Sequence, residues 1–314
     1  MDLLFNAHRQ IAQYGLATAK SRVTSKAQRS CLDAAFKFSA IAPDEADIGF
    51  ASLASSCLPH KSPDASACPE RWSGTTDNVE ITLHSGRYND GRLVGIPYGA
   101  KARIILLYLT TQAVKSSEPQ VELGASMYAW LRAMNEKRLG GMTYRLFAEQ
   151  AKRIAAMTLY ATTHHGQHSE SVSGRGIRAL VSHLDQEPLG DYLEPASTSP
   201  FPHLAQLQPQ FWQAARSHSL PLRLSAISLI GNNSCALDLY VWLIHRLRQL
   251  DEPAEVNWER LHGMFGSGYR HARQMKKPFL EALSLALAVY PQAQVEATDS
   301  GIVLLPSANT EAHF

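Results

Sequence analysis

Apolar and polar positions divide the middle of this chain into a regular succession of short elements. Apolar and polar residues alternate from Val79 to His84, which is typical of a strand with one solvated face. Helical spacing follows over 100–114, from Ser126 to Met134 and over 142–157, with short strands at 121–124 and 158–163. The order of strand, helix, short strand, helix, turn, helix and strand is the order of a winged helix-turn-helix domain.

A second stretch repeats this order. Residues 211–223 have an extended or mixed pattern, a helix is expected near 224–230, and Asn232–Ser234 precede a strong helix over 235–250. A short strand at 255–256, a helix over 258–265, a glycine turn at 266–268 and a long helix over 269–290 come next. Two alternating strands, 294–297 and 302–305, then form a hairpin that resembles a wing, so the pattern predicts an internal structural duplication.

The remaining segments lack such a pattern. Residues 7–38 predict one or two short helices, and 42–74 are rich in proline and serine like a linker. The irregular residues 164–205 predict a long loop or wing insertion and a connection between domains. We therefore expect an α+β fold, mainly helical, made of tandem winged helix-turn-helix domains with a mobile N-terminal extension. The expected boundaries are 1–75 for the extension and linker, 76–190 for the first domain and 205–307 for the second.

Composition excludes some classes of protein and leaves others open. With 45% hydrophobic and 18% charged residues, the 314-residue chain is not a disordered one, and its net charge of +2 gives no argument for nucleic-acid binding. The four cysteines form no C-x-x-C pair, the apolar runs are too short to cross a membrane, and the N-terminus shows no export signal. We expect a cytoplasmic protein with reduced thiols and no membrane partner.

The position of the positive charge is more informative than its sum. On a helical projection of 269–290, apolar residues cluster on one side, and the opposite side carries Arg270, Arg273, Gln274 and Lys277 with Glu281 near its far end. A solvated face normally mixes both signs, so this face after a glycine turn predicts a DNA-reading helix. Pro278 predicts a kink, but the apolar stripe continues in phase across it.

The helix over 142–157 is a weaker candidate of the same kind. Hydroxyls at its start and basic residues on its outer side could reach DNA, but Glu149 lies among them, so an ordinary solvated face explains the pattern about as well. The candidate DNA-binding residues here are Thr143, Tyr144, Arg145, Lys152 and Arg153.

Signatures of catalysis and cofactor binding are missing from the sequence. It has no G-x-x-x-x-G-K-[ST] phosphate loop. His164, His165 and His168 have no carboxylate or cysteine at ligand spacing nearby, and a strand would point the adjacent pair to opposite sides. We expect no catalytic residue, no metal and no cofactor, and therefore a protein that is not an enzyme.

Several segments together resemble one protein family, the plasmid-encoded RepA replication initiators. They are Leu58-Pro-His-Lys, Gly95-Ile-Pro-Tyr-Gly, the helix from Ala102 to Ala113, Leu123-Gly-Ala-Ser, the helix from Ala236 to Leu247, Phe279-Leu-Glu-Ala-Leu and Val289-Tyr-Pro. The resemblance implies a tandem winged-helix protein that binds repeated sites (iterons) in double-stranded origin DNA, opens the origin and helps host proteins load the helicase. It also implies a homodimer that represses while monomers initiate. A nicking-type replication enzyme and a winged-helix transcriptional regulator remain as alternatives.

Overall fold

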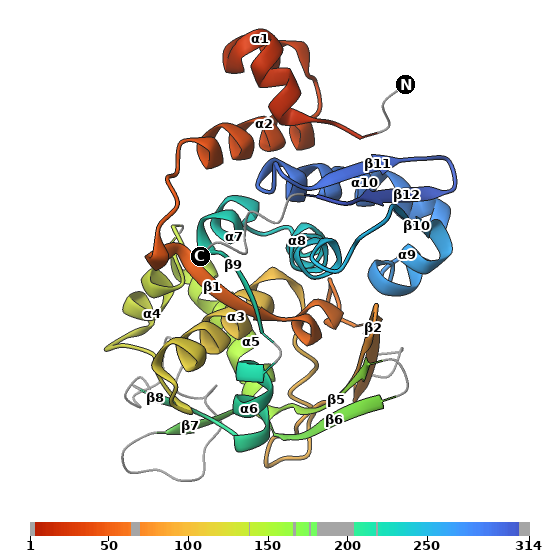
Figure 1. Ribbon diagram of the computed structural model, residues 1–314. Helices are drawn as coiled ribbons and strands as arrows, with labels where there is room; N and C mark the ends of the chain where they lie inside the picture. The colour runs from red at the N-terminus through yellow and green to blue at the C-terminus, as the bar shows by residue number, and fades with distance from the viewer. Residues whose placement is uncertain are drawn as a thin grey trace. The chain divides into compact units, whose positions relative to one another are not determined.

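The chain passes twice between two structural units. The computed structural model describes residues 4–63, 70–137, 139–165, 168–175, 177–180, 204–217 and 219–307. Unit 1 comprises residues 1–49 and 220–314, and unit 2 comprises residues 50–219. The chain enters unit 2 within strand β1 (Ile48–Ser52) and returns at the start of β9 (Ser219–Arg223). Both units combine helices with small sheets, so the predicted α+β class is confirmed (Figure 1).

The C-terminal part of unit 1 follows the predicted order of elements closely. It contains α7 (Leu224–Ile230), α8 (Ser234–Leu247), β10 (Ala254–Asn257), α9 (Trp258–Phe265), α10 (Ala272–Ala288), β11 (Gln294–Ala297) and β12 (Gly301–Leu305). The three strands form an antiparallel sheet in the order β10-β12-β11, with Ile302 opposite both Val256 and Ala297. Asn side chains begin two of the helices: Asn233 accepts from the Ala236 N–H, and Asn257 accepts from the Arg260 N–H.

Aromatic packing holds these helices together. Trp242 of α8 contacts Phe265 edge-to-face with ring centroids 5.6 Å apart, and Phe265 lies 5.9 Å from Phe279 of α10. Trp258 contacts Phe279 at 5.7 Å. Because Trp242, Phe265 and Phe279 are at most 1% exposed, they fix α9 and α10 against α8.

The long helix α10 is shorter than the pattern predicts. It begins at Ala272 rather than at residue 269, because His271 is extended and caps the helix together with Gln274, whose side-chain oxygen accepts from the His271 N–H. Arg270 consequently lies in the turn before the helix. Pro278 lies inside a continuous α10, as the uninterrupted apolar stripe predicts.

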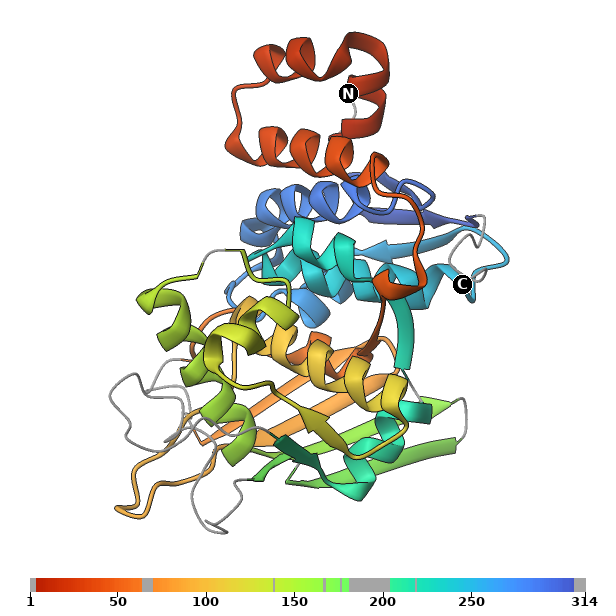
Figure 2. The same ribbon diagram turned by 90° about the vertical axis from the view of Figure 1, so that its left-hand side faces the viewer.

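Residues near the N-terminus form part of unit 1. Helices α1 (Ala7–Arg22) and α2 (Lys26–Ser39) pack on each other, and α2 packs along α10 (Figures 1 and 2). The His8 ring nitrogen lies 2.9 Å from the Ala288 carbonyl oxygen at the end of α10. The two helices confirm the expectation for 7–38, and their packing places them with residues 220–314. The domain boundaries given above stay a prediction.

An ion pair holds the segment after α2. In the short helix η1 (Glu45–Asp47), the Asp47 carboxylate accepts from Arg223 Nε at 2.9 Å and from the Ser225 N–H at 2.6 Å. The Arg223 guanidinium also lies over the Phe38 ring, 4.6 Å from its centroid. Residues 41–47 are thereby tied to the start of α7.

Unit 2 contains more strands than the sequence predicts. Its elements are η2 (Leu53–Cys57), β2 (Arg71–Thr76), β3 (Val79–His84), α3 (Gly99–Ser116), β4 (Gln120–Glu122), α4 (Met127–Ala133), α5 (Gly141–Ala156), β5 (Thr158–His165), β6 (His168–Arg175), β7 (Ile177–Leu180), β8 (Leu204–Leu207) and α6 (Pro209–Ser217). One antiparallel sheet has the order β2-β3-β5-β6 and another has the order β4-β8-β7. Helix α3 packs against α5 and α6 (Figure 2).

The structure adds regular elements to segments of this region for which the sequence predicts few or none. The linker-like segment 42–74 holds η1, β1, η2 and the start of β2, so the expectation of a linker is wrong there. In 164–205, β6 forms a hairpin with β5, as a wing insertion would, and β7 and the start of β8 follow. The segment 211–223, expected to be extended or mixed, holds most of α6 and then β9. The sequence His168–Arg175 has a single apolar residue, Val172, so no hydrophobic period marks this strand, and backbone pairing with β5 creates it. Residues 181–203, which belong to the same expected connection, lie outside the described residues.

The two units share an order of elements but differ in strand pairing. In unit 1, strand β10, which lies between α8 and α9, joins the hairpin β11–β12. In unit 2, the corresponding strand is β4, which lies between α3 and α4 and pairs with β8. The hairpin β5–β6 instead joins β2 and β3. The predicted duplication therefore extends to the succession of elements and not to the sheets.

Candidate nucleic-acid interface

The first half of α10 presents a basic face to solvent. Met275 and Phe279 are 1% and 0% exposed and anchor the helix in the core. On the opposite side, the four sequence-predicted residues of this helix region are all exposed: Arg270, Arg273, Gln274 and Lys277. The first turn of α10 holds no acidic residue, so the positive end of the helix dipole adds to these charges. The electrostatic field at this surface therefore favours the binding of an anion.

Close contacts with His262 define the turn between α9 and α10. The Gly266 N–H donates to the His262 carbonyl at 2.8 Å, and the His262 ring nitrogen lies 2.8 Å from the Tyr269 carbonyl oxygen. A Cβ on Gly266 would lie 2.4 Å from the His262 ring and 2.5 Å from its carbonyl oxygen. Glycine is therefore required here by close approach, and these hydrogen bonds hold the turn that precedes the basic residues.

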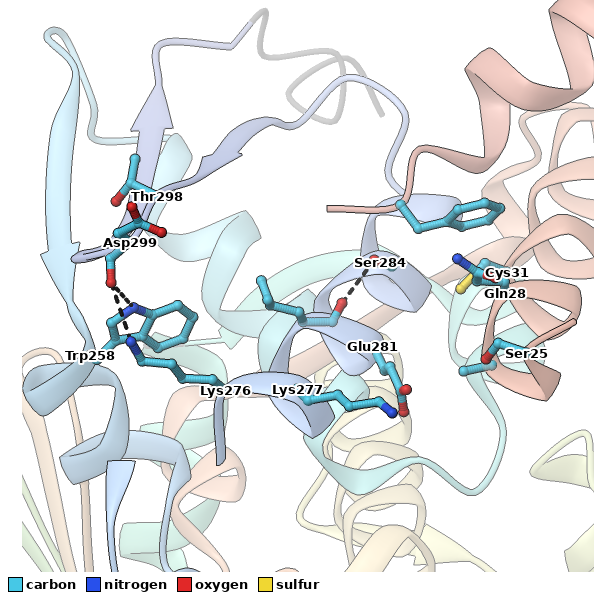
Figure 3. A pocket seen from close by; sticks show the side chains of 13 residues that line it. Ser25, Gln28, Cys31, Trp258, Lys276, Lys277, Glu281, Ser284, Thr298 and Asp299 are labelled. Atoms are coloured by element: carbon cyan, nitrogen blue, oxygen red, sulfur yellow. Dashed lines mark hydrogen bonds between the residues drawn. The ribbon is translucent and has the colours of Figure 1, made fainter. Parts of the chain in front are cut away.

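The tip of the β11–β12 hairpin is fixed beside α10. Trp258 Nε1 donates to the Asp299 carbonyl at 2.9 Å, and Lys276 Nζ donates to the same oxygen at 3.3 Å (Figure 3). Lys276 also lies over the Trp258 ring, 5.0 Å from its centroid. Lys276 is not among the residues predicted from the sequence, and its contacts assign it to positioning the hairpin.

A cavity of about 450 Å³ lies between α2, α10 and the hairpin tip in unit 1. Figure 3 shows Gln28 and Cys31 of α2 and the preceding Ser25 on one side of it, and Lys277 and Glu281 of α10 on the other. Burial raises the pKa of the Cys31 thiol to about 12, and the negative charge of Glu281 acts in the same direction. This thiol therefore stays protonated at neutral pH.

Helix α5 of unit 2 has a less uniform surface. Arg145 is exposed, while Thr143, Tyr144 and Lys152 are half-buried. Leu146 and Met142 are exposed too, at 39% and 63%, so apolar and basic residues mix on the outer side.

Arg153 points into unit 2. Its guanidinium donates to the Ile96 carbonyl at 2.9 Å, pairs with Glu149 at 2.8 Å and lies 5.0 Å from the centre of the Tyr98 ring. A Cβ on Gly95, whose φ is +101°, would lie 2.6 Å from this guanidinium. The structure therefore gives Arg153 an internal role, in holding Gly95–Tyr98 against α5.

A second internal arginine joins two of the family-like segments. Arg103 of α3 is 4% exposed and donates to the carbonyl oxygens of Leu58 at 2.7 Å, Pro59 at 3.3 Å and Gly99 at 3.0 Å. The Gly99 N–H also donates to the Pro59 carbonyl, at 2.9 Å. These contacts bring Leu58-Pro-His-Lys and Gly95-Ile-Pro-Tyr-Gly together at the start of α3.

The histidine segment brings no metal site together among the described residues. His164 Nδ1 lies 2.9 Å from the Ser169 hydroxyl, and its other ring nitrogen lies 3.9 Å from Glu80. Within the described part of the chain, no group of three His, Cys, Asp or Glu side chains gathers at metal-binding distance. The side chains of His165 and His168 lie outside the described residues. Across the same part, no helix is both long and apolar enough to span a membrane.

Comparisons with known proteins found one family model and similar solved structures. Two solved structures of domains 2 and 3 of RctB are similar to this chain. One, residues 155–483 of RctB, has a TM-score of 0.44 and 11% identity, and covers 80% of this chain and 94% of its own. The other, a selenomethionine derivative, has a TM-score of 0.48 and 10% identity, and covers 81% of this chain and 96% of its own. No curated protein sequence matches.

One family model, described as plasmid-encoded RepA protein, matches residues 96–260, more than half of the chain. The match includes the Ile96–Tyr98 segment, the buried Arg103 and helix α8. The chain therefore belongs to the family of plasmid-encoded RepA proteins, which are initiators of plasmid replication.

Proposed function

We propose that this protein initiates replication by binding repeated sites (iterons) in double-stranded origin DNA, with α10 as its main reading helix. The observation that carries the proposal is one exposed surface: Arg270 in the turn before α10, and Arg273, Gln274 and Lys277 in the first half of that helix, with no acidic residue among them. A reading helix contacts base edges mainly with its N-terminal turns, and this is the half of α10 that carries the face.

The surrounding elements support a winged helix. Helices α8, α9 and α10 occur in the order helix, strand, helix, turn, helix and hairpin, and the sheet order β10-β12-β11 places the hairpin beside the first strand. In this arrangement α9 and α10 form the helix-turn-helix and β11–β12 forms the wing. Lys276 and Trp258 fix the wing tip relative to α10, so both would meet the duplex as one rigid surface.

Unit 2 contributes a second, weaker contact in this proposal. Helices α4 and α5 would form its helix-turn-helix. In α5, Arg145 is the exposed cationic side chain, Thr143 and Tyr144 lie in the first turn, and Lys152 lies on the flank. Two such modules would occupy neighbouring turns of one repeat. Several bound repeats would then favour opening of the origin and recruitment of host helicase-loading proteins, with dimerisation of the free protein opposing initiation.

The test is a footprint over the DNA that flanks the gene, together with binding isotherms at several salt concentrations. We expect protection of several evenly spaced repeats. Arg273→Ala and Arg270→Ala should each weaken binding by about 1–3 kcal/mol where the side chain reads a base edge. Lys37→Ala, an exposed lysine at the far end of α2, serves as the charge-matched control and should leave affinity unchanged. Wild-type affinity in both arginine variants would refute α10 as the reading helix, and protection of a single promoter site would favour a regulator.

The proposal also holds that the protein acts by binding and not by catalysis. A nicking-type initiator cuts its origin and leaves a covalent protein–DNA adduct. Incubation of the protein with supercoiled origin DNA and Mg²⁺ separates the two mechanisms on a gel. We expect the DNA to remain supercoiled and free of adduct, and a nicked circle with bound protein would replace this proposal by the enzymatic one.

A further inference from the structure

The segment that leads from α1 into α2 carries basic residues and no acidic ones. Between Asp2 and Asp33 the sequence has no acidic residue, and it has five basic ones. Of these, Arg22 and Lys26 lie on either side of the short turn between α1 and α2, and both are exposed. Thr24 and Ser25 supply two hydroxyls to the same turn. We call residues 22–26 the α1–α2 turn.

The packing of α2 brings this turn beside the basic face of α10. The outward side of α10 continues from Lys277 into Leu280, Glu281 and Ser284, one and two helical turns further on. Residues of α2, together with Leu280, Glu281 and Ser284, line the cavity described above, so α2 lies along this second half of the outward side. Ser25 and Lys277 line the same cavity, so the start of α2 lies at the point where the exposed half of α10 ends (Figure 3).

This arrangement limits how DNA can approach α10. A helix that lies in the major groove, about 12 Å wide, has a phosphate backbone along each side. Because α2 covers the second half of the outward side, only the first half of α10 can enter the groove. The DNA phosphate backbone beside that half would then pass close to the α1–α2 turn, because the turn lies where the exposed part of α10 ends.

We infer that the α1–α2 turn is a phosphate-binding element that extends the DNA interface of α10, with Lys26 and Arg22 as its cationic contacts. The inference rests on the proposed function, since it takes α10 to be the reading helix. It assigns to the N-terminal helices a task that neither the family match, which begins at residue 96, nor the helix-turn-helix itself contains. Phosphate contacts carry no sequence information, so this element would add affinity and orientation but no base preference.

The experiment measures duplex binding by full-length Lys26→Ala and Arg22→Ala proteins over a range of salt concentrations. Each lost phosphate contact should reduce the slope of log K against log salt by about 0.9 and lower affinity roughly 3- to 10-fold, equally for repeat DNA and unrelated DNA. Lys37→Ala is the matched control: it removes the same charge from the same helix, roughly 16 Å further along its axis, and should leave slope and affinity unchanged. A hydroxyl-radical footprint should lose protection only at the backbone that flanks the major-groove site.

The outcomes separate this inference from the proposed function. If wild-type protein binds and Arg273→Ala weakens it while Lys26→Ala and Arg22→Ala do not, the inference is refuted and α10 remains the reading helix. If Lys26→Ala and Lys37→Ala weaken binding equally, the effect is general charge attraction, which also refutes a defined contact at the turn. If neither wild-type nor variant protein prefers repeat DNA, the proposed function itself fails. Thermal unfolding of each variant, monitored by circular dichroism, verifies that Arg22→Ala, which removes an arginine stacked 4.1 Å over Tyr14, still folds.

Discussion

Replacing Arg103 by methionine tests whether the family-like segments around α3 build the fold or contact DNA. The arginine is buried, and its guanidinium donates to three carbonyl oxygens, two of them in Leu58-Pro59 and one in Gly99. Methionine fills much of the same volume but donates no hydrogen bond, so the three oxygens would lose this donor inside unit 2.

The expected cost follows from these contacts. Hydrogen bonds to a charged donor contribute about 1.5–3 kcal/mol each, and neighbouring bonds that share one side chain are not additive. We therefore expect Arg103→Met to destabilise unit 2 by about 3–5 kcal/mol, a large part of the 5–15 kcal/mol by which a typical domain is stable. With a urea dependence of about 2 kcal/mol per molar, the unfolding midpoint falls by roughly 2 M.

Urea unfolding followed by circular dichroism measures this shift, and hydrogen exchange of α3 amides assigns it to unit 2. Arg132→Met, on the exposed side of α4, is the control and should change the midpoint little. Below the transition, Arg103→Met should bind origin DNA far better than Arg273→Ala does. An unchanged midpoint together with lost DNA binding would refute the structural assignment of Arg103 and make these segments part of the interface.

The remaining predictions concern the helix turn, the cavity and the ranking of the two helices. Gly266→Ala places a Cβ against the backbone of His262, so we expect unit 1 to be about 1–3 kcal/mol less stable and to bind DNA more weakly. Urea unfolding and binding isotherms measure the two effects. Wild-type values for both would show that the turn tolerates a side chain. The raised pKa of Cys31 means that its thiol ionises in the unfolded chain, but not in the folded one, as pH rises above about 9. The free energy of unfolding of unit 1 should therefore fall by roughly 1 kcal/mol between pH 9 and 10 because of this residue. Cys31→Ala should remove that part of the pH dependence of unfolding. Lys152→Ala should weaken DNA binding less than Arg273→Ala, because Lys152 is half-buried near Glu149, and the reverse order would make α5 the principal reading helix.

The sequence predicted most where local spacing carries the information. The two sides of α10 follow from residues three and four positions apart, and the structure places Met275 and Phe279 in the core and Arg273 and Lys277 at the surface, as the projection predicts. Helix caps such as Asn233 were also predictable, because the side chain and the backbone N–H that it meets are three residues apart.

Contacts between distant residues were not predictable in this way. Arg153 shares its helix with Lys152, and nothing in the local pattern says that one guanidinium reaches Ile96, 57 positions earlier. Lys276 is one residue from Lys277, yet it turns to Asp299 because the hairpin tip lies there. Strands β2 and β6 are mostly polar and are strands because β3 and β5 offer them paired backbone groups.

The sequence by itself determined the family resemblance, the succession of helices and strands in residues 224–305, and the charge on the first half of α10. Only the tertiary structure decided that α2 covers the second half of the same helix, that Arg103 and Arg153 face inward and that the α1–α2 turn adjoins the basic face. The physical reason is that hydrophobic periodicity records which side of an element is buried, and it does not record which element buries it.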